Sequence, residues 1–291
     1  MNFFFCLGRT PSLSVLELEA VFHVLPQKPQ IKSVDREILI AQTNTLDPRA
    51  LMGRLGGTPK LGECILTLSG DFDISKTATL IAQTIPYHSS RITIGVSAYS
   101  LPWGVRKIRR SVESLGFAIK KILREKAASV RIVLPGDGNT LSSVQVEKNN
   151  LTSENGYEFV LLPSPEGITI GKTLAVQPFE EYSFRDWNRP GKTPELGLLP
   201  PKIAQIMINL ANVAPGKQAI LYDPFCGSGT ILQEALLMGH TAVWGSDIEK
   251  NAVEKTKENL SWLAEKKNLS LETVRLFVAD ATKQNSSARP L

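Results

Sequence analysis

Leu221-Tyr-Asp-Pro-Phe-Cys-Gly-Ser-Gly-Thr230 is the stretch that decides the fold of this chain. The apolar run 219–222 predicts a short buried strand that ends at Asp223. After a turn of small residues, apolar side chains recur at helical spacing at Ile231, Leu232, Ala235 and Leu236. A strand, a glycine-containing turn and a helix form the geometry that holds a nucleoside cofactor at the carboxyl end of a parallel strand.

The turn itself narrows the choice of ligand. A phosphate-binding P-loop needs Gly-Lys-Ser/Thr, and this turn has no lysine. A dinucleotide fingerprint needs a third glycine where Leu232 stands. S-adenosylmethionine (SAM) carries a carboxylate and an ammonium but no pyrophosphate, so Asp223 could face its ammonium and the turn amides its carboxylate. An ordinary β–α turn without a ligand remains the alternative for the turn taken alone.

Two further acidic residues follow predicted strands downstream. Residues 241–245 predict a second strand followed by Asp247, and residues 274–279 predict a third followed by Asp280, with a helix over 249–264 between them. Asp247 lies near the spacing at which an acidic residue meets ribose hydroxyls. A single Asp after a strand is usually a structural cap. Three at one edge of a parallel sheet favour a cofactor site.

Several motifs together resemble one family. They are Asp223-Pro-Phe-Cys-Gly-Ser-Gly-Thr230, Ser246-Asp247, Ala279-Asp-Ala-Thr282, Phe184-Arg-Asp-Trp-Asn-Arg-Pro190, Leu199-Pro-Pro-Lys202 with the residues up to Ala211, and the opening Leu7-Gly-Arg-Thr-Pro-Ser-Leu-Ser14. This set resembles the THUMP-containing RNA guanine-N2 methyltransferases, most closely the archaeal and eukaryotic tRNA position-10 type. The resemblance covers nearly the full length and is most specific around the glycine turn and Leu-Pro-Pro-Lys.

The resemblance implies a SAM site and an RNA partner, most often tRNA. In it, Asp247 takes the ribose hydroxyls and Asp280 the adenine amine. The cofactor-binding residues carried over are Asp223, Pro224, Phe225, Cys226, Gly227, Gly229, Thr230, Asp247, Ile248, Asp280 and Ala281.

Composition excludes several other classes. No uncharged apolar run reaches the length of a membrane span, and the apolar opening lacks the basic start of a signal peptide. The cysteines Cys6, Cys64 and Cys226 have no metal-ligand spacing and predict reduced thiols in a cytoplasmic protein. The three histidines are isolated from one another, so no metal site is predicted.

Pattern predicts an α/β chain, and a length of 291 residues allows about two domains. We expect a ferredoxin-like α+β unit over 1–70, a THUMP-like domain over 71–177, a linker over 178–198 and the first half of a Rossmann-like methyltransferase domain over 199–291. Predicted helices cover 11–24, 47–55, 73–85 and 103–128. Predicted strands cover 3–8, 37–42, 64–68, 91–98, 130–134, 141–146, 158–162 and 168–177.

The long predicted helix 103–128 carries basic residues at both ends. Residues 1–170 hold 19 Lys and Arg against 15 Asp and Glu, whereas residues 171–291 hold 14 against 13. The helix dipole favours cations near the C-terminus but not near the N-terminus. Phosphate binding accounts for both clusters, and a solvated surface is the alternative. The candidate RNA-binding residues are Arg106, Lys107, Arg109, Arg110, Lys120, Lys121 and Arg124, with Lys126 close by.

The family's acceptor motif, Asp/Asn-Pro-Pro-Tyr/Phe at the end of a fourth strand, does not occur in this sequence. The catalytic residues therefore stay unassigned, and we expect no methyl transfer from this chain alone. Either the chain is truncated or a second chain or self-association completes the sheet. The alternative functions are a non-catalytic RNA-binding protein with a relic SAM site, and a methyltransferase acting on ribosomal RNA or DNA.

Overall fold

A computed structural model of the chain describes residues 1–86, 88–125, 127–136, 138–191, 198–213 and 219–283. The chain divides into two compact units. The first unit comprises residues 1–11, 29–52 and 58–178. The second comprises residues 12–28, 53–57 and 179–291. Each unit is described by itself.

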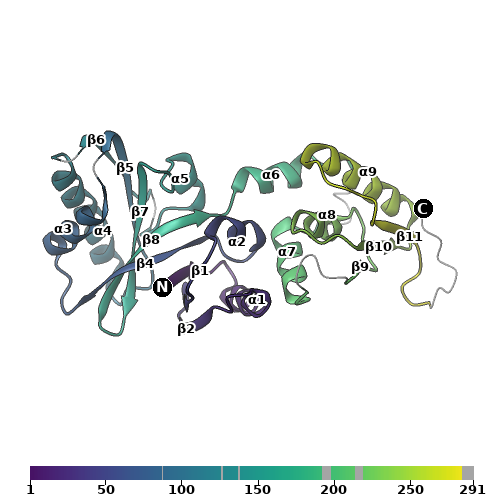
Figure 1. Cartoon of the computed structure of the whole chain (residues 1–291), viewed down its shortest axis with the longest axis horizontal. Helices are drawn as coiled ribbons and strands as arrows, with labels where there is room; N and C mark the ends of the chain where they lie inside the picture. Colours follow the sequence, from purple (N-terminus) through teal and green to yellow (C-terminus); the bar gives the residue numbers. More distant parts are fainter. Residues whose placement is uncertain (87, 126, 137, 192–197, 214–218, 284–291) are drawn as a thin grey trace. The chain divides into compact units, whose positions relative to one another are not determined.

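The first unit is built on one eight-stranded sheet with the order β2-β3-β1-β4-β8-β7-β5-β6 (Figure 1). Strand β5 runs parallel to both of its neighbours, and the other pairs are antiparallel. The strands are β1 (Asn2–Cys6), β2 (Gln30–Val34), β3 (Ile38–Gln42), β4 (Lys60–Ser69), β5 (His88–Ala98), β6 (Ala127–Val133), β7 (Gly156–Ser164) and β8 (Gly167–Val176).

Helices α3 (Ile74–Thr84) and α4 (Val105–Leu123) pack with β5 and β7 in the largest apolar core, which includes Ile81, Ile94, Leu115 and Phe159. The Asp73 side chain caps α3 by accepting a hydrogen bond from the Lys76 N–H at 2.7 Å. Strand β4 pairs with β8 along its whole length. One continuous sheet therefore contains strands from both predicted segments, 1–70 and 71–177, whose boundary stays a prediction.

Two predicted elements of the first unit are wrong. Residues 141–146, predicted as a strand, lead into helix α5 (Ser143–Lys148), which begins at a capping box formed by Ser142 and Gln145. The helix predicted to reach residue 128 ends at Leu123, and β6 begins at Ala127. Strand β2 was not predicted. The basic residue Lys126 lies outside the described residues.

The second unit holds a three-stranded parallel sheet in the order β11-β10-β9. Its strands are β9 (Leu221–Asp223), β10 (Val243–Asp247) and β11 (Arg275–Val278), and its helices include α7 (Pro201–Leu210), α8 (Thr230–Leu237) and α9 (Lys250–Lys267). Leu232, Val243, Leu260 and Leu276 form a core between the sheet and α8 and α9. The strand–turn–helix order predicted from the sequence is confirmed.

Two segments distant in sequence belong to this second unit. They are most of helix α1 (Pro11–Val24) and the end of helix α2 (Pro48–Arg54) with the loop after it. The buried Glu17 carboxylate accepts hydrogen bonds from the N–H groups of Gly56 and Gly57 and from the Asn209 amide, each at 2.8 Å. These bonds attach the N-terminal helix to α7.

The predicted linker 178–198 contains helix α6 (Phe179–Trp187), whereas residues 192–197 lie outside the described part. The Arg185 guanidinium on α6 binds the Glu234 carboxylate on α8 at 2.6 Å, and both side chains are buried. Gln205 on α7 donates to the same carboxylate at 3.0 Å. Burial raises the pKa of Glu234, and the charge of Arg185 opposes that rise. This segment is thus packed against the helix that follows the glycine turn.

Candidate cofactor site

The structure brings the three predicted acidic residues to one edge of the parallel sheet. Asp223 ends β9, Asp247 ends β10, and Asp280 follows β11 by two residues. Asp223 is level with Gly245, and Asp247 is level with Val278. Because the strands are parallel, their carboxyl ends meet at the same edge. The glycine turn lies at this edge, between β9 and α8.

The two glycines of the turn both have a positive φ but differ in the space around them. Gly227 has φ of +52° and Gly229 has φ of +82°, a region that residues with a Cβ rarely adopt. A Cβ on Gly229 would lie 2.8 Å from the Thr256 methyl carbon on α9, so this position is also sterically closed. A Cβ on Gly227 would meet nothing within 4 Å among the described atoms. The turn is therefore tight against α9 at Gly229 and open at Gly227.

Asp247 ties the turn to the end of β10. Its carboxylate accepts hydrogen bonds from the Gly227 N–H and from the Glu249 N–H, each at 3.0 Å. A carboxylate offers about four acceptor positions, so these bonds leave room for two hydroxyl donors. That these donors are the hydroxyls of a ribose stays a prediction from the sequence spacing.

Asp223 is nearly buried, with an exposed fraction of 9%. Its carboxylate accepts a hydrogen bond from the Phe225 N–H at 3.0 Å. Burial raises the pKa of Asp223 above its ordinary value, and the nearby charge of Asp247 raises it further. A cationic group placed at this carboxylate would relieve both effects.

Asp280 is held in its ionised form by a local turn. Its carboxylate accepts hydrogen bonds from the Thr282 hydroxyl at 2.6 Å and the Thr282 N–H at 3.0 Å, and Lys283 lies 3.1 Å away. The hydrogen bonds from Thr282 come first in lowering the pKa of Asp280 to about 2. An exocyclic amine would compete with Lys283 for this carboxylate.

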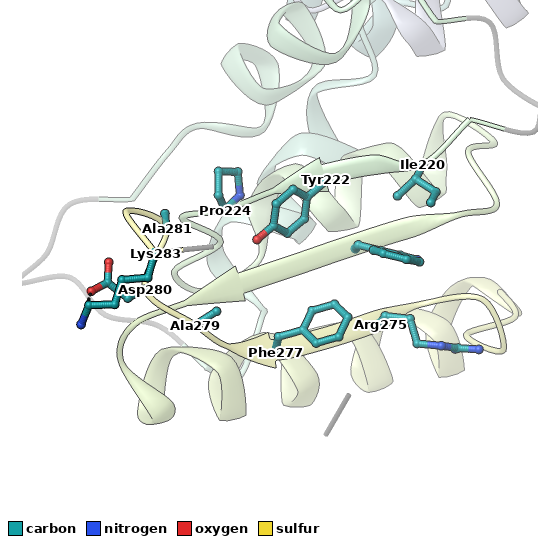
Figure 2. Close-up of a pocket in the computed structure, with 10 residues that line it drawn as sticks. Ile220, Tyr222, Pro224, Arg275, Phe277, Ala279, Asp280, Ala281 and Lys283 are labelled. Atoms are coloured by element: carbon teal, nitrogen blue, oxygen red, sulfur yellow. Dashed lines mark ion pairs between the residues drawn. The ribbon is translucent and has the colours of Figure 1, made fainter. Parts of the chain in front are cut away.

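A pocket of about 720 Å³ begins at this edge and extends over one face of the sheet (Figure 2). Of the predicted cofactor residues, it contains Pro224, Asp280 and Ala281, whereas Gly227, Gly229 and Asp247 are not part of its lining. Its full lining is Ile220, Tyr222, Pro224, Trp244, Arg275, Phe277, Ala279, Asp280, Ala281 and Lys283.

The aromatic lining was not predicted. Figure 2 shows Tyr222 of β9 and Phe277 of β11 beside the same pocket. Their strand neighbours Leu221 and Leu276 alternate onto the other face, which packs with α8 and α9. Tyr222 is 49% exposed, and its hydroxyl shares a hydrogen bond with Ser246 at 2.7 Å. The signal in the sequence was one aromatic residue in each strand, Tyr222, Trp244 and Phe277.

The remaining predicted residues differ in exposure. Phe225 is 75% exposed and Ile248 is 64% exposed, so both side chains are accessible beside the turn. Cys226 is buried, its sulfur lies 3.7 Å from the Thr256 hydroxyl, and burial raises its thiol pKa to about 11. It is therefore a packing residue rather than a nucleophile. Thr230 is buried and accepts a hydrogen bond from Arg189 at 2.6 Å.

The candidate RNA-binding residues lie on α4 and just after it. Arg109 pairs with Glu113 at 3.2 Å, and Lys107 lies over the Trp103 ring at 5.1 Å. Arg106 and Arg110 are exposed. Near the other end of α4, Lys120 joins a groove of about 390 Å³ on the edge strand β6, whose polar and aromatic members are Arg91, Phe117, Lys120, Ser129 and Arg131. Lys121 and Arg124 are exposed beside it.

Two further findings concern the described residues. They contain no group of three or more His, Cys, Asp or Glu arranged to hold a metal ion. None of their helices is both long and apolar enough to cross a membrane.

Comparison with known proteins gives matches to methyltransferases. A family model described as RMKL-like, methyltransferase domain matches residues 190–288. The tRNA (guanine(10)-N2)-dimethyltransferase of Methanothermobacter thermautotrophicus is 49% identical over 74 residues, which is 25% of this chain and 21% of that protein. The enzyme of the same name from Methanocaldococcus jannaschii is 39% identical over 85 residues, 29% of this chain and 22% of that protein.

The matched segments span only about a fifth of those two relatives. Their names support the resemblance to the tRNA guanine-N2 methyltransferases found in the sequence. The fold is similar to that of TrmN from Thermus thermophilus, with a TM-score of 0.54 and 18% identity, covering 97% of this chain and 74% of that one. This likeness confirms the α/β fold class and the Rossmann-like sheet. The ferredoxin-like and THUMP-like assignments stay predictions.

Proposed function

We propose that the chain binds SAM at the glycine turn and acts in the methylation of guanine N2 in tRNA. The observation that carries this proposal is the meeting of Asp223, Asp247 and Asp280 around one glycine turn at the carboxyl edge of a parallel sheet. The names of the two tRNA (guanine(10)-N2)-dimethyltransferases supply the acceptor.

Each residue has a role that its surroundings support. Asp223, with a raised pKa, takes the ammonium of the methionine part. The open N–H groups at the start of α8 take its carboxylate, since no side chain among the described residues caps this helix. Asp247 takes the two ribose hydroxyls, and Asp280 takes the adenine amine, with Ile248 and Ala281 beside the ring.

Bound SAM supplies an electrophilic methyl group on its sulfonium. The guanine amine must be oriented toward that methyl and must lose a proton during or after attack. The described residues hold the cofactor's two ends and leave the acceptor-binding group unassigned. Methyl transfer from labelled SAM to bulk tRNA, with ribosomal RNA in parallel, tests the acceptor, and robust turnover would overturn the expectation that this chain alone does not methylate. Calorimetry with SAM tests the cofactor, and absence of binding would overturn the proposal.

The affinity for SAM should fall as the pH is lowered. An ammonium at Asp223 stabilises the charged carboxylate, so binding lowers a pKa that is raised in the free protein. The full affinity is present above that raised pKa and is lost as the pH falls through it toward the ordinary value of 3.8. Calorimetric titrations from neutral to acid pH should show this loss, and Asp223→Asn should bind weakly with a flatter profile. An unchanged slope in Asp223→Asn would contradict the assignment.

We infer that α4 and the groove on β6 form the RNA-binding surface of the first unit. Replacing Arg106 and Arg110 together, two exposed arginines that form no ion pair with the described residues, should weaken tRNA binding and reduce the salt dependence of log K by about two units, one for each lost phosphate contact. The control is Lys257→Ala with Lys266→Ala, which removes two exposed positive charges from α9, one of them in a surface ion pair with Glu265 at 3.8 Å. Filter-binding at several salt concentrations measures the slopes. Equal slopes for both double variants would mean that α4 is a solvated surface and does not bind RNA.

We also propose that the exposed edge of β9 pairs with a second copy of the chain, which completes the three-stranded sheet. Ile220 is 53% exposed, and β10 is the only partner of β9 among the described strands. Sedimentation velocity should show concentration-dependent association that Ile220→Lys reduces. Leu16→Lys, at a position that is 52% exposed on α1, is the control and should leave association unchanged. A parent chain that stays monomeric would contradict this proposal.

A further inference from the structure

Three buried polar side chains bind the carbonyl groups of the glycine turn. The Thr256 hydroxyl donates to the Gly227 carbonyl at 2.8 Å, and the Asn259 amide donates to the Ser228 carbonyl at 2.8 Å. The Gln233 amide donates to the carbonyl of Gly229 at 3.2 Å. The exposed fractions of these side chains are between 0% and 2%. Three successive carbonyls of the turn are thus fixed from the protein interior.

Fixing the carbonyls also fixes the direction of the amides. In a trans peptide the C=O and the following N–H point in opposite directions. The N–H groups that follow the three carbonyls belong to Ser228, Gly229 and Thr230. That of Gly229 is used by the Cys226 carbonyl at 2.7 Å. Those of Ser228 and Thr230 are turned away from the buried donors, and neither has a hydrogen-bond partner within the described part of the chain.

Asn259 is the most constrained of the three side chains. Its Oδ1 accepts from the Gly191 N–H at 2.7 Å, while its Nδ2 donates to the Gly191 carbonyl at 3.0 Å and to the Ser228 carbonyl. These partners leave one orientation for the amide. The Arg189 guanidinium binds the Thr230 hydroxyl at 2.6 Å. The segment 189–191 and α9 together therefore hold the turn from its interior side.

We propose that Asn259 is a positioning residue: by holding the Ser228 carbonyl, in the peptide between those that Thr256 and Gln233 hold, it keeps the turn in the conformation that presents the amides of Ser228 and Thr230 to the carboxylate of the methionine part of SAM. The inference rests on the proposed use of SAM. Asn259 touches the turn and not the ligand, so it sets the affinity for the carboxylate end alone. An aspartate of the same size has no N–H to donate, and it would place a negative charge against the carbonyls of Gly191 and Ser228.

The test compares two ligands that differ in the carboxylate-bearing part. S-adenosylhomocysteine carries the whole amino-acid end, whereas 5′-methylthioadenosine keeps the adenine and ribose and lacks the carboxylate. Asn259→Asp should bind S-adenosylhomocysteine about tenfold more weakly, as for one lost charge-assisted contact of about 1.4 kcal/mol, and 5′-methylthioadenosine almost unchanged. Asn251→Asp makes the same change at an exposed position of α9 and should alter neither affinity.

Thr256→Val provides a second variant, which removes the donor to the Gly227 carbonyl with little change in shape. It should show the same selective loss, and it keeps the proposal testable if Asn259→Asp does not fold. Equal weakening of both ligands in each variant means a structural role and overturns the inference. If the parent binds both ligands equally well, the turn does not recognise the carboxylate, and the inference falls while SAM binding stands. If the parent binds neither, the proposed function falls as well.

Discussion

Asp247→Ala is expected to lower the affinity for SAM by about 100-fold. Asp247 helps to tie β10 to the turn, because its carboxylate accepts a hydrogen bond from the Gly227 N–H at 3.0 Å. It also offers two acceptor positions to the ribose. Hydrogen bonds to a charged group contribute about 1.5–3 kcal/mol each, and a net loss of about 3 kcal/mol corresponds to about 100-fold in Kd.

Calorimetry with SAM measures this effect, and two further variants separate its parts. Asp247→Asn keeps one acceptor oxygen, so it should lie between the parent and the alanine variant. Asp71→Ala, at an exposed position of the first unit, should bind SAM as the parent does. If Asp247→Ala retains the parental Kd, the ribose assignment is wrong. If it loses 5′-methylthioadenosine and S-adenosylhomocysteine equally, the ribose is the part of the ligand that it holds.

The meeting of three acidic residues at one edge of the sheet could be predicted from the sequence because its determinants are local. Asp223 and Asp247 end short strands and Asp280 follows one by two residues, and parallel strands place their carboxyl ends together. The glycines at 227 and 229 stand where the backbone needs positive φ. Neither property depends on what the rest of the chain does.

The aromatic face could not be predicted in the same way. Tyr222, Trp244 and Phe277 alternate with core residues in short parallel strands, a pattern typical of a sheet covered on both faces. Burial of the second face depends on another layer of structure, which strand composition does not report. The sequence therefore predicts apolar strands but not the exposure of Tyr222.

One local signal was misinterpreted, and a second does not report a buried ion pair. Residues 141–146 contain Leu and Val at spacings that suit a strand, but the Ser142–Gln145 capping box specifies a helix start. The charged residues around Arg185 suggest a linker because a charge is usually solvated. The partner of Arg185 is Glu234, which lies 49 residues further along the chain. The ion pair between them therefore cannot be recognised from the local sequence.

The sequence also did not predict that most of α1 belongs to the second unit, because the partners of its buried carboxylate are distant in sequence. Glu17 is a charged residue on a helix, and nothing nearby in sequence marks it as buried. Its partners are at Gly56, Gly57 and Asn209. Sequence order favours domains made of continuous segments, whereas hydrogen bonds that span up to 192 residues join this helix to α7.

Glu234→Leu is expected to destabilise the second unit by about 3 kcal/mol or more. The substitution leaves the Arg185 guanidinium buried beside α8 without the carboxylate that lies 2.6 Å away, and removing one partner of a buried ion pair costs about 3–5 kcal/mol. It also leaves the Gln205 amide without its acceptor on α8. Replacing both charged residues, as Arg185→Met with Glu234→Leu, should recover much of the loss, because neither variant side chain then needs a charged partner.

Urea unfolding followed by tryptophan fluorescence measures these differences, because Trp262 stacks on Phe184 of α6 at 4.8 Å and reports the attachment of that helix. The exposed pair of Glu254 with Lys250 supplies the control, and Glu254→Leu should change the free energy of unfolding by less than about 0.5 kcal/mol. A single variant Glu234→Leu as stable as the parent would show that α6 does not depend on this ion pair. The segment before α7 would then be a linker, as its composition alone suggests. A large loss of unfolding free energy in Glu234→Leu that the double variant recovers would make α6 an integral part of the second unit. Its partner helix α8 is the one that begins at the glycine turn.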